Sequence, residues 1–152
     1  MQHAEEDYGI WQFRAWNFGS TRGRVLARVG QYGLKDDLEG LAIMHLPDGR
    51  GYLLASSQGN DSYAVFDLAK PNEWLGRFQI VASETGVDGV TSTDGIEVMA
   101  TAMGQYLQGL MVVQDDENTQ PQGNQNFKLV SWGQVAASMG LDRFPEWNPR
   151  DP

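Results

Sequence analysis

The chain has 152 residues, which suits one domain, and its 20 acidic residues against 11 basic ones give a formal net charge of −9. This charge disfavours nucleic acid and anionic membranes as partners, because both need clusters of Lys and Arg, and no apolar run approaches the ~18 residues of a membrane span. The sequence holds no cysteine, which excludes disulfides, zinc–thiolate sites and a cysteine nucleophile.

Short apolar runs separated by turn-forming residues predict a chain built from antiparallel strands. Strong turn signals stand at Pro47-Asp48-Gly49 and at Gly59-Asn60-Asp61-Ser62. The pattern indicates an all-β meander. The predicted strands cover residues 9–16, 24–29, 40–45, 51–57, 63–69, 74–81, 96–100, 110–113 and 127–130.

One short helix is predicted near the C-terminus. Ser131 can cap a helix over residues 132–139, whose apolar residues fall on one face, and Gly140 can end it. The following residues, 141–152, are rich in proline and predict an extended tail. We therefore expect a folded part over residues 1–140 and a Pro-rich tail over residues 141–152.

The same succession of segments occurs twice in the chain. Each copy opens with an acid next to a glycine, and these two acids, Glu39 and Asp94, are 55 positions apart. In each copy the second apolar run ends on a glutamine, and Gln58 and Gln114 are 56 positions apart. A period of roughly 40 to 55 residues built from short strands is the signature of β-propeller blades.

A third, shorter copy begins the chain. Glu5-Glu6-Asp7 precede an aromatic run much as residues 58–61 precede residues 63–66. The apolar strand that should stand before Glu5 is absent from the pattern, so the chain begins inside a repeat. A closed propeller needs about four or more blades. We therefore expect the chain to be the C-terminal part of a longer protein, covering roughly the last two to three blades.

Acidic residues recur once per repeat at the ends of the predicted strands. The ends of successive propeller blades meet at one rim, so these residues should converge. Several carboxylates close together repel one another unless a cation lies between them, and oxygen-only ligands favour calcium over transition metals. The alternative is that acids beside glycine are ordinary turn residues. The candidate rim residues are Glu6, Asp37, Glu39, Gln58, Asp94 and Asp115.

A loop over residues 87–95 carries two Asp-Gly pairs, at Asp88 and Asp94, separated by hydroxyl residues. Such a loop can surround an ion with side-chain and main-chain oxygens, but it lacks the spacing of the helix-flanked calcium loop. Neither His3 nor His45 stands in a recognisable spacing with a serine and an acid. The loop is therefore a second candidate for cation binding.

These segments resemble the β-propeller phytases, also called alkaline phytases. The similarity lies in DLEGLAI, DGRGYLLASSQGNDSYAVFD, VDGVTSTDGIEV, QDDEN and NQNFKLVSW, and EEDYGIWQF also fits it. It covers nearly the whole chain, to about residue 140. The resemblance implies an all-β, six-bladed propeller that hydrolyses phosphate monoesters of phytate (myo-inositol hexakisphosphate) or calcium-phytate. It also implies several calcium ions and attack by a calcium-bound water.

Carried over position by position, the resemblance also implies site residues. It implies a structural calcium ligand at Asp88, nearby oxygens from residues 124–126 and no covalent nucleophile. Ser92 stands where relatives often carry an acid. The same resemblance implies an enzyme of the 3-phytase type, and the absence of cysteine suits a secreted or periplasmic protein. The implied catalytic residues are Glu6, Asp37, Glu39, Gln58 and Asp94, and the implied metal ligands are Glu6, Asp37, Glu39, Asp88 and Asp94.

Two other classes of function stay open at this point. The chain could form a non-catalytic, calcium-stabilised propeller fragment or binding module. A propeller lactonase or sugar-binding enzyme would also use an acidic calcium site, but the segment SSQGNDSYAVF disfavours it. In any of these cases, part of a propeller exposes an apolar blade face and open strand edges, so we expect self-association.

Overall fold

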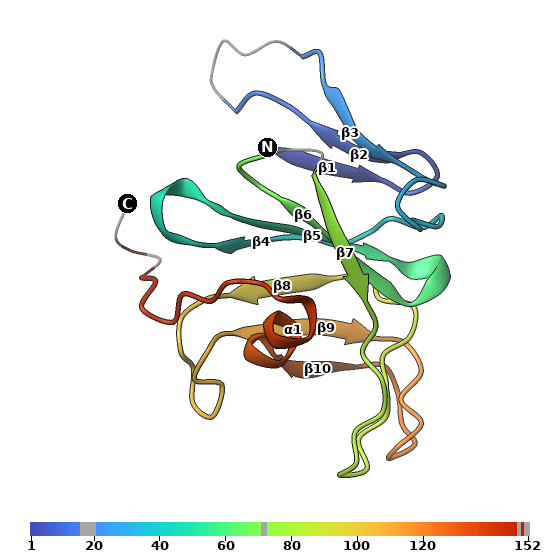
Figure 1. Cartoon of the computed structure of the whole chain (residues 1–152). Helices are drawn as coiled ribbons and strands as arrows, with labels where there is room; N and C mark the ends of the chain where they lie inside the picture. Colours follow the sequence, from blue (N-terminus) through green and yellow to red (C-terminus); the bar gives the residue numbers. More distant parts are fainter. Residues whose placement is uncertain (16–20, 71–72, 149, 151–152) are drawn as a thin grey trace.

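The computed structural model describes residues 1–15, 21–70, 73–148 and 150. Within these residues the chain forms three antiparallel sheets, packed side by side, and one α-helix (Figure 1). The prediction of an all-β chain with one short C-terminal helix is confirmed. Sheets that pack on one another in chain order are the arrangement of neighbouring propeller blades.

The first sheet has the order β1-β2-β3 and contains a strand that the hydrophobic pattern did not predict. We expected no strand before Glu5, but β1 lies there, because pairing with β2 outweighs a short, mostly polar sequence (Gln-His-Ala-Glu). The predicted strand over 9–16 ends earlier, and Trp16 lies outside the described residues. The strands are β1 (Gln2–Glu5), β2 (Gly9–Gln12) and β3 (Arg24–Arg28).

The second sheet has four strands in the order β4-β5-β6-β7. All seven residues of β5 are buried, because this strand lies inside a sheet that is covered on both faces. Short 3-10 turns at Pro47–Gly49 and Gln58–Asn60 join β4 to β5 and β5 to β6. The strands are β4 (Leu41–His45), β5 (Gly51–Ser57), β6 (Ser62–Asp67) and β7 (Trp74–Phe78).

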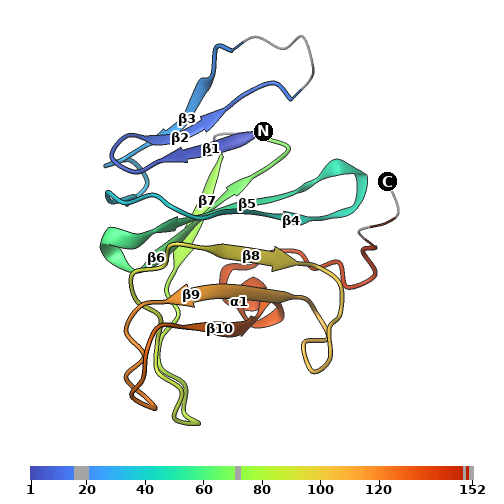
Figure 2. The same ribbon diagram turned by 180° about the vertical axis from the view of Figure 1, so that it is seen from behind.

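The third sheet has the order β10-β9-β8, and its strand β8 packs beside β4 of the second sheet (Figure 2). Its three strands correspond to runs that the sequence predicted, each extended or shortened by one or two residues in total. They are β8 (Ile96–Met99), β9 (Leu110–Asp115) and β10 (Asn126–Ser131).

The helix α1 (Trp132–Met139) follows β10 directly and has the predicted bounds. Gly140 ends it with φ 68°, a left-handed conformation that glycine adopts easily. Ser131 occupies the N-cap position, but its hydroxyl makes no capping hydrogen bond. No helix among the described residues is long and apolar enough to span a membrane.

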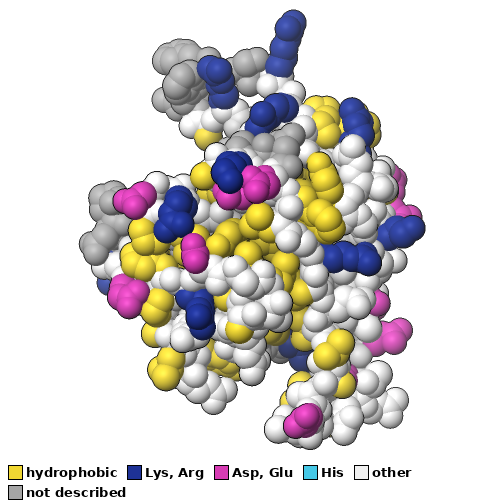
Figure 3. Space-filling view, viewed as in Figure 1, with side chains coloured by type: hydrophobic (Ala, Val, Ile, Leu, Met, Phe, Trp, Pro, Cys, Tyr) yellow, Lys and Arg dark blue, Asp and Glu magenta, His cyan; other side chains and the backbone are white. Residues whose placement is uncertain are grey.

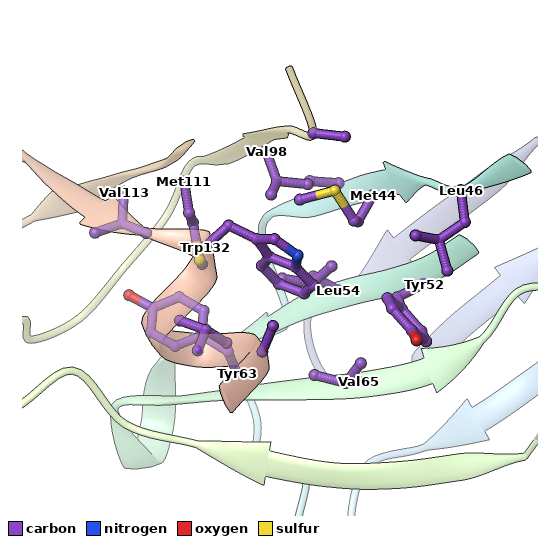
Figure 4. Close-up of a cluster of buried hydrophobic side chains, with 14 of the residues drawn as sticks. Met44, Leu46, Tyr52, Leu54, Tyr63, Val65, Val98, Met111, Val113 and Trp132 are labelled. Carbon is purple, nitrogen blue, oxygen red and sulfur yellow. The ribbon is translucent and has the colours of Figure 1, made fainter. Parts of the chain in front are cut away.

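Two apolar clusters hold the three sheets together. One lies between the second and third sheets and the helix, with fully buried Trp132, Val65 and Met111 at its centre (Figure 4). The other lies between the first and second sheets and includes Ile10 and Phe66. Because the second sheet packs against a neighbour on each face, the loops at the sheet ends are held in fixed relative positions.

The predicted tail contributes to the first cluster. Leu141, Phe144 and Trp147 pack against its buried residues. The Asp142 carboxylate lies 3.2 Å from the Arg50 guanidinium, which ties this segment to the second sheet. The boundary at residue 140 stays a prediction, and residues 149, 151 and 152 lie outside the described part of the chain.

Candidate functional site: an acidic rim

The candidate site lies at one edge of the stacked sheets. Strands β1, β5 and β9 end at this edge, and strands β4 and β8 begin there, on the right-hand side of Figure 1. In the same orientation Figure 3 shows Asp and Glu side chains along this edge, with Lys and Arg among them. We call this edge the rim.

The loop before β4 links the rim positions of the first and second sheets. The Leu38 amide donates to the Glu6 carbonyl at 3.3 Å, and the Gln58 amide donates to the Asp37 carbonyl at 3.0 Å. Asp37 itself has φ 57°, a left-handed conformation that Asp tolerates better than most residues. Main-chain contacts on both sides therefore fix the position of this loop.

A close main-chain approach links the rim positions of the second and third sheets. A Cβ atom on Gly40 would lie 2.7 Å from the Asp94 carbonyl oxygen and 2.9 Å from the Ile96 nitrogen. Since real side chains do not tolerate such distances, only glycine fits at this position. The glycine lets the loop before β4 lie against the loop before β8, so that Glu39 comes near Asp94.

The charges of the rim acids act on one another. The pKa of the Glu39 carboxyl is raised, first by partial desolvation and then by the negative charges of Glu6, Asp94 and Asp37. Glu6, Asp94 and Asp37 are thus close enough to Glu39 to act on its charge, and the four residues lie in loops that adjoin three different sheets. Their mutual repulsion is the condition that a bound cation would relieve.

Two glutamines from equivalent positions of the repeat hold Asp94. Gln58, which follows β5, donates through Nε2 to Asp94 Oδ1 at 2.6 Å. Gln114, near the end of β9, accepts from the Asp94 amide through Oε1 at 2.9 Å. The rim therefore combines free carboxylates with amide groups that orient one of them.

Asp88 and Asp115 lie in a separate, buried polar cluster. Lys128 Nζ pairs with Asp88 Oδ1 and lies 3.0 Å from Asp115 Oδ2. Asp88 Oδ2 also accepts from the Thr119 hydroxyl at 3.0 Å and from the Gln120 amide at 3.1 Å. Both oxygens of Asp88 thus accept hydrogen bonds from within the protein.

The cluster shifts the pKa values of Asp88 and Lys128 in opposite directions. The hydrogen bond from Lys128 holds the pKa of the Asp88 carboxyl well below its usual range. Burial lowers the pKa of Lys128, but the hydrogen bonds and charges of Asp88 and Asp115 outweigh burial and raise it overall. The Asp88 carboxylate and the Lys128 ammonium therefore stabilise each other's charged form.

Comparison with known proteins decides the family. The model of the phytase family matches residues 1–151. The chain belongs to the phytase family. It is 43% identical over 152 residues to the 3-phytase of Bacillus subtilis (strain 168), and the match covers 97% of this chain and 40% of that protein. This phytase-family chain thus spans about 40% of the length of the curated relative that it matches.

The rim of this phytase-family chain suits a hard cation by its chemistry. The four interacting acids and Gln58 supply only oxygen donors, the ligands that calcium prefers. Within the described part of the chain, no group of three or more His, Asp and Glu side chains is arranged as a preformed metal centre. The ligand roles of Glu6, Asp37, Glu39 and Asp94 therefore stay predictions.

The role of Asp88 as a metal ligand also stays a prediction, since its charge is balanced by Lys128. The sequence analysis missed Lys128. The alternation of side chains along the strand could have indicated it. Phe127 and Leu129 face solvent, so Lys128 between them faces the interior. Asn126, from the stretch implied to supply oxygens, pairs with Asp115 in the sheet and has a buried Oδ1 without a hydrogen-bond partner.

Proposed function

We propose that this chain carries part of a calcium-dependent phytase, which releases inorganic phosphate from the monoesters of phytate. Membership of the phytase family and the 3-phytase relative support the substrate class. The observation that carries the proposal is the rim, where Glu6, Asp94 and Asp37, in loops beside three sheets, act on the charge of Glu39. A secreted or periplasmic location, which the absence of cysteine suits, is part of the same proposal.

The rim acids have a defined role in this proposal. Without a counter-charge, four carboxylates would repel a phosphate ester, which is itself strongly negative. Bound calcium ions supply positive charge for the phosphate oxygens and make water more acidic. The chain's own contribution is to hold the ligands: Asp37 and Glu39 on one loop, Glu6 beside it, and Asp94 oriented by Gln58.

A second candidate is a non-catalytic, calcium-stabilised binding module. One observation suits it as well as it suits an enzyme: the charges of Glu6, Asp94 and Asp37 around Glu39 favour a bound cation and do not by themselves require a reaction. In this case calcium would bind and stabilise the chain without phosphate release.

Phosphate release from phytate at neutral pH, with calcium and then with excess chelator, tests the proposal. The key variant is Asp37→Asn, and the matched control is Asp48→Asn. Both aspartates have left-handed φ values, 57° and 61°, but Asp48 lies in the β4–β5 turn at the opposite end of the sheets. We expect calcium-dependent release that Asp37→Asn lowers at least about tenfold and Asp48→Asn leaves unchanged.

Calorimetric titration of calcium into the same proteins separates the two candidates. Calcium binding that Asp37→Asn weakens, with no phosphate release by the parent chain, would support the binding module. Equal release by both variants would show that Asp37 plays no part in the reaction.

A further inference from the structure

The turn that carries Asp94 is held by side chains that the sequence analysis did not assign to the site. We propose, on the basis of the function proposed above, that Asp61 and Gln114 are positioning residues. They act through the turn at residues 92–94 and fix the Asp94 carboxylate at the rim. Neither residue needs to touch a cation or substrate in this role.

Asp61 and Gln58 hold the first residue of the turn from both sides. Asp61 Oδ1 accepts from the Ser92 amide at 2.8 Å, and Gln58 Nε2 donates to the Ser92 carbonyl at 3.3 Å. Ser92 has φ 44°, a left-handed conformation that a serine keeps only when its surroundings impose it. The two hydrogen bonds supply this constraint.

The next two residues of the turn are held in the same way. The Thr93 hydroxyl lies 2.5 Å from the Tyr63 hydroxyl, and both residues are buried. The Asp94 amide donates to Gln114 Oε1 at 2.9 Å. Each residue of the turn therefore has its own partner, from the β5–β6 region or from β9.

This arrangement separates positioning from ligation. Asp61 Oδ1 is engaged with the Ser92 amide, and Gln114 Oε1 is engaged with the Asp94 amide, so both act on the main chain of the turn. Groups that orient a metal ligand from behind are worth about 10–100-fold in metal affinity. Loss of either hydrogen bond should loosen the turn and weaken cation binding through Asp94.

The test compares four variants of the full chain. Asp61→Ala and Gln114→Leu remove the acceptors, whereas Asp61→Asn keeps an oxygen at the same place without the charge. Asp67→Ala is the matched control, because Asp67 lies at the other end of β6 and its carboxylate accepts from the amides of residues 69 and 70 at 2.8 and 3.1 Å. Hydrogen–deuterium exchange of peptides spanning residues 91–95 and calorimetric titration with calcium alone are the two readouts.

We expect Asp61→Ala and Gln114→Leu to speed exchange over residues 91–95 and to weaken calcium binding about tenfold. Asp61→Asn and Asp67→Ala should behave like the parent chain in both readouts. Unchanged exchange in Asp61→Ala would overturn the inference whether or not calcium binds. Equal loss of affinity in Asp61→Ala and Asp61→Asn would overturn it as well, since Asp61 would then act by its charge.

Failure of the parent to bind calcium, with fast exchange in Asp61→Ala, would refute the cation site and leave the contacts of the turn established.

Discussion

At the scale of single residues, two carboxyl groups respond to their surroundings in opposite directions. Desolvation and, after it, the neighbouring acids raise the pKa of Glu39, so its charge destabilises the folded chain at neutral pH. The ion pair with Lys128 lowers the pKa of Asp88, so its charge stabilises the fold. The negative charge at Glu39 adds to those of its acidic neighbours and can attract a cation, whereas the charge of Asp88 is balanced by Lys128.

This contrast predicts opposite pH dependences for two variants. Asp88 contributes its stability above the pH at which unfolded carboxyl groups titrate, about 4, and loses it as the pH falls through its lowered folded pKa. Asp88→Asn should therefore unfold at lower denaturant concentration than the parent at pH 7, and the gap should narrow on acidification. Glu39→Gln should be more stable than the parent at pH 7 in chelator, and this gain should disappear below about pH 4.

Urea titrations at pH 7 and at about pH 2.5 measure both effects, because Asp88 loses its contribution only below about pH 4. A difference in stability between the parent and Asp88→Asn that widens on acidification would contradict the charge assigned to Asp88. A Glu39→Gln variant that is less stable than the parent at pH 7 in chelator would contradict the effect assigned to Glu39.

At the scale of elements, strands with a clear apolar pattern were predictable and strands without one were not. The run at residues 51–57 has the observed bounds of β5, and the helix was predicted to the residue from Ser131 and Gly140. Strand β1 was not predictable, since its four residues are mainly polar and it forms by pairing with β2. Pairing between strands is a long-range property that local patterns do not contain.

The same limit applies to the candidate site. The period of the repeat named the rim acids, because equivalent positions of successive blades meet at one edge. It did not reveal that Asp61 contacts Ser92, 31 positions away. Nor did it reveal that Lys128 lies beside Asp115 and contacts Asp88, which is 40 positions away. These partners depend on how neighbouring sheets pack.

The helix α1 gives a direct test of the packing between the second and third sheets. Trp132 is fully buried at its first position, among residues from both sheets. Trp132→Ala should lower the free energy of unfolding by about 3–5 kcal/mol, the range for removing a large buried aromatic side chain. The control is Phe127→Ala on β10, where the side chain is 70% exposed and the expected change is within about 0.5 kcal/mol. Similar losses in both variants would show that α1 does not form part of the core.

At the scale of the whole molecule, the sheets at the two ends of the stack are covered on one face only. The second sheet lies between two neighbours, and its strand β5 is buried throughout. On β10 of the third sheet, Phe127 and Leu129 are 70% and 55% exposed. Adjacent exposed apolar side chains on an edge strand favour association with other chains.

We therefore expect the chain alone to self-associate. Phe127→Lys combined with Leu129→Lys should shift the population toward the monomer, because two charges on the edge strand oppose pairing. Sedimentation velocity over a range of protein concentrations measures this shift. A parent chain that is monodisperse and monomeric at all concentrations would contradict the prediction.

Two of the rim acids, Glu39 and Asp94, occupy equivalent places in successive repeats and are separated by 55 positions. The number of acidic residues at the rim therefore depends on the number of repeats in the chain. A duplication that added one repeat would add an acid at the same edge, and a deletion would remove one, while the packing within each sheet stayed the same. In evolution the capacity of such an edge for cations would change in whole steps, without a new site having to arise.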